Sequence, residues 1–405
     1  MKTRYGVSPW VLNFPDSRRP DHPRLRGEHA VDVVIVGGGL AGCATAYACA
    51  SAGLKTILLE GDRLGQGSAG RSAGLLLPEP GPQFRDVAAA LGLRSARHAF
   101  EAWRRASLDA AALLRRLKIR CELEPLTTLT LSPGDSEKIL RREFEARVDA
   151  GLSPAWLGAR QVKSATGLDA AAAMRVRDAF TLDPYRACLG LATAAGARKA
   201  KLFERTRVRK VKFTRKDALV LTDDAAVRTS KVVVTTGMAT VEFSQLRRHF
   251  KRRETYLALT EPVPATIRKQ LGPQDMTFRD SHTPRRRVRW TADHRLLIAG
   301  ADQDQPADRL RDATRIQRTG QLMYELLTMY PAIAGLRPEF GWELPYGETA
   351  DGLMYIGAHR NYPHHVFALG GPSDSITGAF LAARLVTRAV QDASEKEDQV
   401  FGFTR

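Results

Sequence analysis

The segment from residue 31 to residue 60 constrains the fold of this 405-residue chain more than any other, and it reads VDVVIVGGGLAGCATAYACASAGLKTILLE. An apolar run leads into Gly37, Gly39 and Gly42 in the spacing GxGxxG, and a small-residue stretch then leads into a second apolar run that ends at Glu60. The first glycine permits a tight turn, the second lets a pyrophosphate approach the backbone, and the third lets a helix pack closely on a strand. The N-terminus of that helix attracts phosphate, and an acid about 20 residues further on accepts hydrogen bonds from a ribose diol. The segment therefore predicts a strand–turn–helix–strand unit that binds an adenine dinucleotide.

Three further features favour FAD over NAD as that dinucleotide. The glycine motif stands near the beginning of a long chain, and the loop after it, GQGSAGRSAG, is longer and richer in glycine than the short crossover of an NAD fold. An apolar strand VVVTTG that ends at Gly237 and a late strand-to-helix segment LGGPSDSITGAF offer two more backbone edges. Such edges suit an extended cofactor that runs across a parallel sheet. We therefore predict FAD.

The same motifs resemble those of the D-amino-acid oxidase-like flavoproteins, the group of glycine oxidase, sarcosine oxidase and the gamma-glutamylputrescine oxidases. DVVIVGGGLAGCATAYACASAG matches the opening of that group, GQGSAGRSAG looks like its flavin loop GxSGRNGG, and ETADGLMYIG resembles its turn T-x-DGxPxIG. ADHRLLIAG is similar to a strand of its substrate domain, and the order of the motifs is preserved over nearly the whole chain. The resemblance implies an FAD-dependent enzyme that oxidises the C–N bond of a small amine or amino acid by hydride transfer to flavin N5.

The resemblance also implies a set of cofactor-binding residues. Glycines 37, 39 and 42 would hold the pyrophosphate, and Glu60 would hold the adenosine ribose. The remaining positions would contact the flavin side chain, the adenine, the adenosine pocket and the flavin O2 edge; they are Arg71, Ser72, Val208, Gly237, Gly370, Asp374, Ser375, Ile376 and Thr377. A helix N-terminus at the O2 edge would stabilise the anion that develops on reduction.

The chain departs from the family pattern at two places. Ser72 and Ala73 stand where the flavin loop usually has asparagine and glycine. Residues 372–375, with the sequence PSDS, replace the glycines of the usual tail. These changes place side chains where bare backbone usually meets the flavin ring.

Candidate substrate contacts come from the strands expected to cover the flavin, and they are Tyr256, Arg289 and Tyr346. Arg289 could clamp a substrate carboxylate with two hydrogen bonds, or it could be one more charge of the basic run RRRVR. The two tyrosines could orient the substrate or could be packed aromatic side chains. The histidines lack the spacing of a metal motif such as HExxH, so we assign no metal.

The length indicates two intertwined domains, because a single hydrophobic core seldom grows beyond about 250–300 residues. We expect an α/β protein with a Rossmann-type FAD-binding domain and a second, antiparallel-sheet substrate domain. The segment TLDPYRACLGLATAAGARK predicts a helix with Pro184 in its first turn. The predicted FAD-binding domain comprises residues 29–85, 181–252 and 338–405, the substrate domain comprises residues 86–180 and 253–337, and residues 1–28 form an extended arm.

The chain is strongly basic, with 62 Lys and Arg against 44 Asp and Glu and a net charge of +18. Such a charge attracts anionic molecules, but no zinc-finger, RRM or helix-turn-helix signature accompanies it, so we do not favour nucleic acid as a partner. The expected partners are a small amine or amino acid and an electron acceptor, oxygen or another; the oligomeric state stays open. The four cysteines have no CxxC spacing and suit burial as free thiols. No apolar run reaches the about 20 residues of a membrane span, and we expect a cytoplasmic protein.

Two other functions are compatible with the sequence. The same fold could oxidise a 2-hydroxy acid, as neighbouring flavoproteins do. Alternatively, the chain could be a flavoprotein that no longer turns over and serves as a subunit of a larger complex, since its tail is altered and its basic clusters could be partner surfaces.

Overall fold

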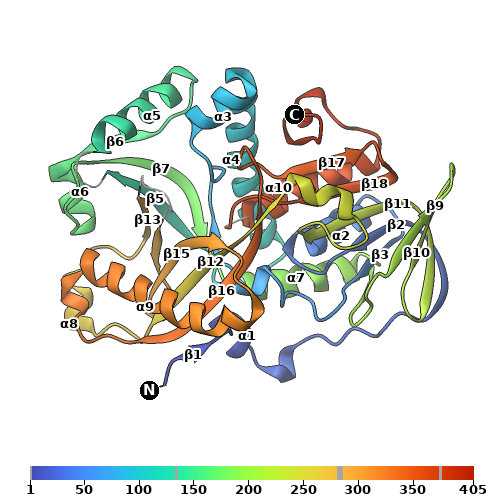
Figure 1. Ribbon diagram of the computed structural model, residues 1–405, viewed down its shortest axis with the longest axis horizontal. Coiled ribbons are helices and arrows are strands. Elements are labelled where there is room, and N and C mark those ends of the chain that lie inside the picture. Colours follow the sequence, from blue (N-terminus) through green and yellow to red (C-terminus); the bar gives the residue numbers. More distant parts are fainter. Residues whose placement is uncertain (1, 133–135, 281–285, 374–375) are drawn as a thin grey trace.

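The computed structural model describes residues 2–132, 136–280, 286–373 and 376–405. Within these residues the strands form two sheets, one of ten strands and one of eight. The ten-stranded sheet lies on the left of Figure 1 and the eight-stranded sheet on the right, with helices around and between them. The predicted α/β class is confirmed.

The eight-stranded sheet contains the glycine motif. It runs in the order β17–β18–β11–β2–β3–β8, is parallel from β18 to β8, and carries the β9–β10 hairpin on β11. Its central strands β2, β3 and β11 each contain a run of four buried residues that is mainly apolar, as expected of parallel strands covered on both faces. The strands are β2 (Gly27–Val36), β3 (Thr56–Leu59), β8 (Lys201–Phe203), β9 (Lys210–Phe213), β10 (Ala218–Leu221), β11 (Ala225–Gly237), β17 (Tyr355–His359) and β18 (Tyr362–Leu369).

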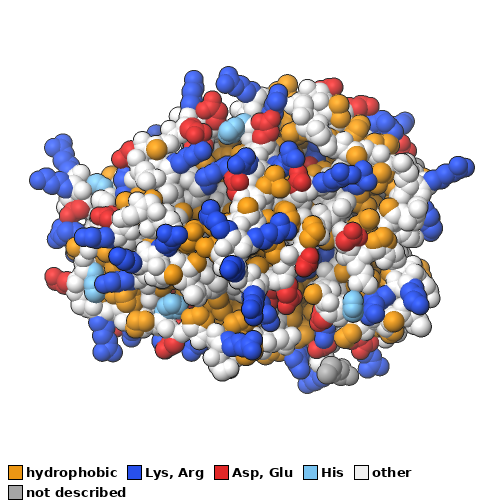
Figure 2. All heavy atoms as spheres, turned by 180° about the vertical axis from the view of Figure 1, so that it is seen from behind, with side chains coloured by type: hydrophobic (Ala, Val, Ile, Leu, Met, Phe, Trp, Pro, Cys, Tyr) orange, Lys and Arg blue, Asp and Glu red, His pale blue; other side chains and the backbone are white. Residues whose placement is uncertain are grey.

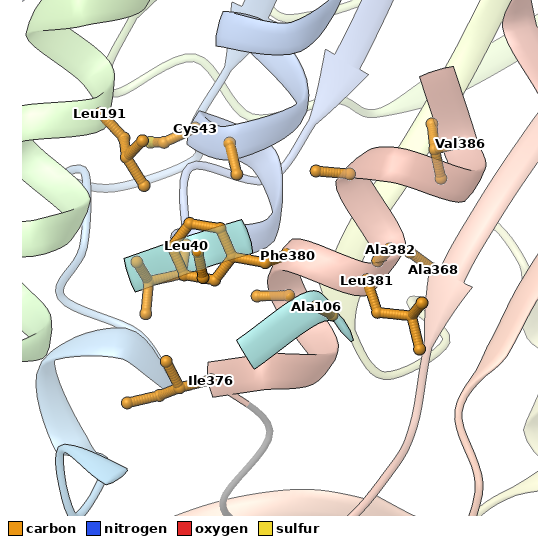
Figure 3. Close-up of a cluster of buried hydrophobic side chains, with 14 of the residues drawn as sticks. Leu40, Cys43, Ala106, Leu191, Ala368, Ile376, Phe380, Leu381, Ala382 and Val386 are labelled. Atoms are coloured by element: carbon orange, nitrogen blue, oxygen red, sulfur yellow. The ribbon is translucent and has the colours of Figure 1, made fainter. Parts of the chain in front are cut away.

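Four helices pack together beside this sheet, and they are α2 (Leu40–Ser51), α4 (Leu93–Arg116), α7 (Pro184–Ala197) and α10 (Ile376–Val390). Figure 3 shows their meeting point, where Leu40 and Cys43 of α2 lie near Phe380 of α10 and Leu191 of α7. Helix α2 is buried on nearly every side, which its small residues permit. Helix α7 begins at Pro184 as predicted, and the Asp183 carboxylate before it accepts hydrogen bonds from the first free N–H groups.

The ten-stranded sheet runs in the order β1–β16–β12–β15–β14–β13–β5–β7–β4, with β6 paired to β7. It is antiparallel except where β1 meets β16 and β13 meets β5. One face packs on α9 (Arg311–Met329), and the other packs on the loop that follows β3. The strands are β1 (Arg4–Tyr5), β4 (Leu75–Leu76), β5 (Glu124–Ser132), β6 (Ala155–Gly158), β7 (Ala172–Thr181), β12 (Lys251–Thr260), β13 (Met276–Asp280), β14 (Arg287–Trp290), β15 (Leu296–Asp304) and β16 (Pro338–Glu348). Further helices are α1 (Pro9–Leu12), α3 (Phe84–Leu91), α5 (Glu137–Asp149), α6 (Ala159–Thr166) and α8 (Ala265–Arg268).

The two sheets cut across the predicted domain segments. Strands β4 and β16 fall inside segments 29–85 and 338–405, which we assigned to the FAD-binding domain, yet both pair within the ten-stranded sheet. In the predicted arm, α1 and the aromatic side chains Trp10 and Phe14 pack against the core. The division into domains stays a prediction.

The surface and the cysteines are consistent with the bulk composition. Figure 2 shows Lys and Arg side chains scattered over one face of the molecule among neutral and acidic ones. The four cysteines are free and buried, as expected. No helix among the described residues is long and apolar enough to cross a bilayer.

A buried ion-pair network fastens α5 to the loop that precedes α3. Arg147 of α5 pairs with Glu143 on its own helix and with Glu79 of the loop, and Glu79 also binds Arg279 of β13 at 2.7 Å. Glu143 in turn accepts the backbone N–H of Phe84 at 2.7 Å, at the start of α3. The Arg147 side chain is only 2% exposed, so its charge depends on these partners rather than on water.

We expect Arg147→Ala to lower the free energy of unfolding by about 3–5 kcal/mol, because it leaves two buried carboxylates short of a partner. Urea denaturation followed by circular dichroism measures the change. The matched control is Arg105→Ala, which breaks an exposed i,i+4 pair with Asp109 on α4 and should cost at most about 1 kcal/mol. Equal losses in the two variants would contradict a structural role for the network.

Candidate functional site: a dinucleotide pocket beside a substrate-facing sheet

The glycine turn brings α2 into direct contact with the backbone of the sheet. A Cβ added to Gly42 would lie 1.8 Å from the carbonyl oxygen of Gly37, and a Cβ on Gly37 would lie 2.9 Å from the carbonyl oxygen of Thr235. Gly37 has a φ of +110°, which an L side chain rarely adopts. By contrast, a Cβ on Gly39 would meet nothing within 4 Å. The N-terminus of α2 therefore faces open space at Gly39, where a phosphate could approach the free N–H groups.

Glu60 lies immediately after β3 and is held in place by backbone N–H groups. Its carboxylate accepts from Gly38 N at 2.6 Å and from Asp62 N at 2.8 Å. Each carboxylate oxygen keeps further acceptor capacity for a ribose hydroxyl. The N–H of Thr206 donates to the carbonyl of Glu60 at 2.8 Å, so the segment that leads to Val208 runs beside the acid. The adenine contact of Val208 stays a prediction.

A narrow pocket of about 60 Å³ extends from the N-terminus of α2. Five of the predicted cofactor-binding residues line it, although they come from separate parts of the chain: Gly39, Ser72, Gly237, Gly370 and Ile376. The pocket also has walls that we did not predict, formed by Leu40, Ala41, Ser68, Ala69, Thr235, Met354, Ala368, Ser373 and Ala379. Thr235 lies in the strand VVVTTG, and Met354 lies in the turn ETADGLMYIG. Ser68 lies in the loop GQGSAGRSAG, residues 65–74, which we call the flavin-like loop. The motifs therefore contained these residues, although we did not single them out.

Two predicted residues point elsewhere, and two cannot be placed. The guanidinium of Arg71 reaches Glu343 of β16 at 3.3 Å and does not line the pocket. The hydroxyl of Thr377 donates to the carbonyl of Leu77 at 2.7 Å, so it connects α10 to the segment just after β4. Asp374 and Ser375 lie outside the described residues.

Arg289 lies on the face of the ten-stranded sheet that packs on the flavin-like loop. Its guanidinium donates to Ala73 O at 2.6 Å and to the hydroxyl of Thr181, and it lies 5.4 Å from the ring centre of Trp10. The side chain lines a cavity of about 690 Å³, a volume typical of sites for small molecules. Ser72, next to Ala73, lines the dinucleotide pocket. Arg289 therefore connects the wall of the cavity to the loop that also lines the pocket.

The two predicted tyrosines lie on opposite faces of this sheet. Tyr346 shares the loop-facing side with Leu344, and its hydroxyl donates to Asp302 at 2.8 Å. Burial, with the Asp302 charge, raises the pKa of Tyr346, so its hydroxyl stays protonated. The next residue, Gly347, accepts the N–H of Gly371 at 3.0 Å, which places Tyr346 near the tail loop of the pocket.

Tyr256 lies on the face of the sheet that is turned away from the flavin-like loop. It packs in the cluster that faces α9, and its hydroxyl donates to the buried Glu254 at 2.9 Å. Successive residues of a strand point to opposite faces, and the loop-facing neighbours in β12 are Leu257 and Leu259. The role of Tyr256 as a substrate contact stays a prediction.

Comparison with known proteins decides the cofactor. The chain matches the model of the DAO family, described as FAD dependent oxidoreductase, over residues 32–389. The chain belongs to this family. It is 26% identical over 94% of its length to a probable oxidoreductase OrdL of Haemophilus influenzae, and covers 88% of that protein. It is 22% identical over 91% of its length to the gamma-glutamylputrescine oxidoreductase of Escherichia coli, of which it covers 85%.

The fold agrees with that assignment. The crystal structure of glycine oxidase from Geobacillus kaustophilus superposes on this chain with a TM-score of 0.73 at 21% identity. The superposition covers 93% of this chain and 99% of the glycine oxidase chain. This flavoprotein therefore uses FAD, and the site suits that cofactor: Gly39 and Gly237 face space that no protein atom occupies within 4 Å of an added Cβ. Among the described residues, no group of three or more His, Cys, Asp or Glu is arranged to hold a metal ion.

The open space at Gly39 yields a test of where FAD lies. We expect Gly39→Ala to leave the unfolding temperature of the apoprotein unchanged, because its Cβ meets no protein atom, and to raise the Kd for FAD at least tenfold. The matched control is Gly158→Ala at the N-cap of α6, where φ is −78° against −79° at Gly39 and an added Cβ would also meet nothing within 4 Å; it should leave both quantities unchanged. Fluorescence titration of apoprotein with FAD measures the Kd, and an unaltered Kd in Gly39→Ala would place the pyrophosphate elsewhere.

Proposed function

We propose that this flavoprotein oxidises the C–N bond of an amino acid or a small amine that carries a carboxylate. Two proteins that this chain resembles support the reaction class: one is a glycine oxidase, and the other is a gamma-glutamylputrescine oxidoreductase. The observation that carries the proposal is the position of Arg289, buried between the flavin-like loop and the cavity of about 690 Å³. The guanidinium is fixed by donating through Nε and Nη1 to Ala73, Thr181 and Trp290, and its buried positive charge beside the cavity attracts a carboxylate.

The proposed reaction needs orientation of the substrate more than acid–base chemistry. When bound, FAD supplies the oxidant, which accepts a hydride from the carbon next to nitrogen, and water then hydrolyses the resulting imine. The nitrogen lone pair assists departure of the hydride, so no strong base is needed. Tyr346 agrees with this, because its raised pKa keeps the hydroxyl protonated and its O–H donates to Asp302, so the oxygen can accept a hydrogen bond from a substrate N–H. We propose that Arg289 fixes the carboxylate and that Tyr346 orients the substrate.

The reaction class is tested with the visible spectrum of the FAD-loaded protein under anaerobic conditions. We expect a pool of amino acids to bleach the oxidised flavin bands, and a pool of 2-hydroxy acids to leave them unchanged. Bleaching by the hydroxy acids alone would replace the proposed reaction, and a flavin that no pool reduces would favour a non-catalytic subunit. Reoxidation in air, compared with reoxidation by an artificial acceptor, then distinguishes an oxidase from a dehydrogenase.

Arg289→Gln tests the carboxylate contact. A hydrogen bond to a charged group is worth about 1.5–3 kcal/mol, so the Kd for a carboxylate substrate should rise about 10- to 100-fold, measured by anaerobic titration of FAD-saturated protein. An amine without a carboxylate serves as the internal control, because its Kd should change less than threefold. Arg252→Gln, an exposed arginine of β12, should change neither value. Equal weakening of both substrates in Arg289→Gln would refute the assignment.

A further inference from the structure

Four consecutive backbone carbonyls of the flavin-like loop each accept a hydrogen bond from a side chain outside the loop. The carbonyl of Gly70 accepts from the hydroxyl of Ser8. The carbonyls of the next three residues accept from Trp342 Nε1 onto Arg71 at 2.7 Å, from Trp10 Nε1 onto Ser72 at 3.0 Å and from Arg289 Nε onto Ala73 at 2.6 Å. Backbone carbonyls in irregular segments need partners when they are buried, and here the partners come from three different parts of the chain. We call the donors Ser8, Trp10, Arg289 and Trp342 the carbonyl clamp.

Two of the four clamp donors belong to the segment that the sequence suggested was only a surface arm. Ser8 is the N-cap of α1, and its hydroxyl accepts from Val11 N while it donates to Gly70. Val11 approaches Gly70 so closely that a Cβ there would lie 2.7 Å from Val11 Cγ2. Phe14 then packs edge-on against Tyr185 of α7, with ring centres 5.3 Å apart. The arm is therefore docked on the loop through several independent contacts.

Trp10 has a second role in addition to its hydrogen bond. Its indole ring lies against the guanidinium of Arg289 and forms part of the wall of the cavity of about 690 Å³. Its N–H holds Ser72, which lines the dinucleotide pocket. One side chain of the arm thus contacts both the loop of the cofactor pocket and the residue that we propose binds the substrate carboxylate.

We propose that Trp10 is a positioning residue for FAD, and that the arm is a part of the cofactor site. Through the indole N–H it fixes the backbone at Ser72, so that the loop presents a preformed wall to the cofactor. Ser68 and Ala69 of the same loop also line that pocket. A change in the position of the loop would therefore alter several walls of the pocket at once. This inference rests on the FAD site described above and does not require that the substrate be an amine.

Trp10→Phe tests the inference, because it keeps an aromatic ring but removes the indole N–H together with the pyrrole part of the ring, a loss of ring atoms that the control variant below reproduces. We expect the Kd for FAD to rise about tenfold and the visible bands of the bound flavin to shift, as measured by reconstitution of the apoprotein. The unfolding temperature of the FAD-loaded form should fall more than that of the apoprotein, because a ligand that binds less tightly stabilises the folded state less. Ser8→Ala, which removes the other donor of the arm, should shift the Kd in the same direction.

The matched control is Trp156→Phe, the same substitution in β6, where the indole packs against Phe144 and Arg141 away from the loop. This variant should change the Kd for FAD by less than twofold and should not shift the flavin spectrum. If Trp10→Phe also leaves the Kd within twofold, or if it destabilises the apoprotein and the loaded protein equally, Trp10 is a packing residue and the inference is overturned. Because no substrate enters this measurement, its result is independent of the amine and amino-acid titrations.

Discussion

The structure depends first on the absence of side chains where α2 meets the sheet. With a Cβ on Gly42, the helix would have to retreat from the carbonyl oxygen of Gly37, which stands 1.8 Å from that position. The close contact places the N-terminus of α2 directly at the ends of β2 and β11, where Gly37, just after β2, contacts Thr235 of β11. Parallel strands and helix N-termini converge on one edge only when the helix can lie this near the sheet. The dinucleotide pocket and the helix layer seen in Figure 3 therefore share one steric origin.

That part of the molecule was predictable because its signals are local. Glycine spacing, the apolar strands and Glu60 lie within 30 residues, and each has a steric or hydrogen-bonding reason that does not depend on distant segments. The start of α7 was predictable on the same ground, since Asp183 and Pro184 satisfy and preorganise the first turn by themselves. Gly39, Gly237 and Gly370 follow or end parallel strands, and the carboxyl ends of parallel strands lie at the same edge of a sheet. For this reason the three glycines meet at one pocket.

The sequence could not predict the direction of a side chain where partners far along the chain set it. Tyr256 lies in a strand whose pairing with β15 shifts register between Glu254 and Tyr256, and a shift of one residue exchanges the two faces of a strand. Arg71 turns toward Glu343, 272 positions away, and the motif around Arg71 carries no information about that acid. Strand β16 likewise joined the ten-stranded sheet because of its pairing with β12, although its sequence neighbours β17 and β18 belong to the other sheet.

The flavin-like loop explains how two sheets of such different topology form one site. Its carbonyls are held by the ten-stranded sheet through Trp342 and Arg289, while residues of the same loop line the pocket of the eight-stranded sheet. Glu343 extends this connection, because it accepts from Arg71 of the loop and, at 2.5 Å, from Arg315 of α9. That hydrogen bond raises the pKa of Arg315, so the guanidinium stays charged. The net charge of +18 therefore says little about the field in the site, because Arg71 and Arg315 share Glu343 and Arg289 is held by Ala73 O. Burial protects the pair of Arg315 and Glu343 from the salt that screens the surface charges.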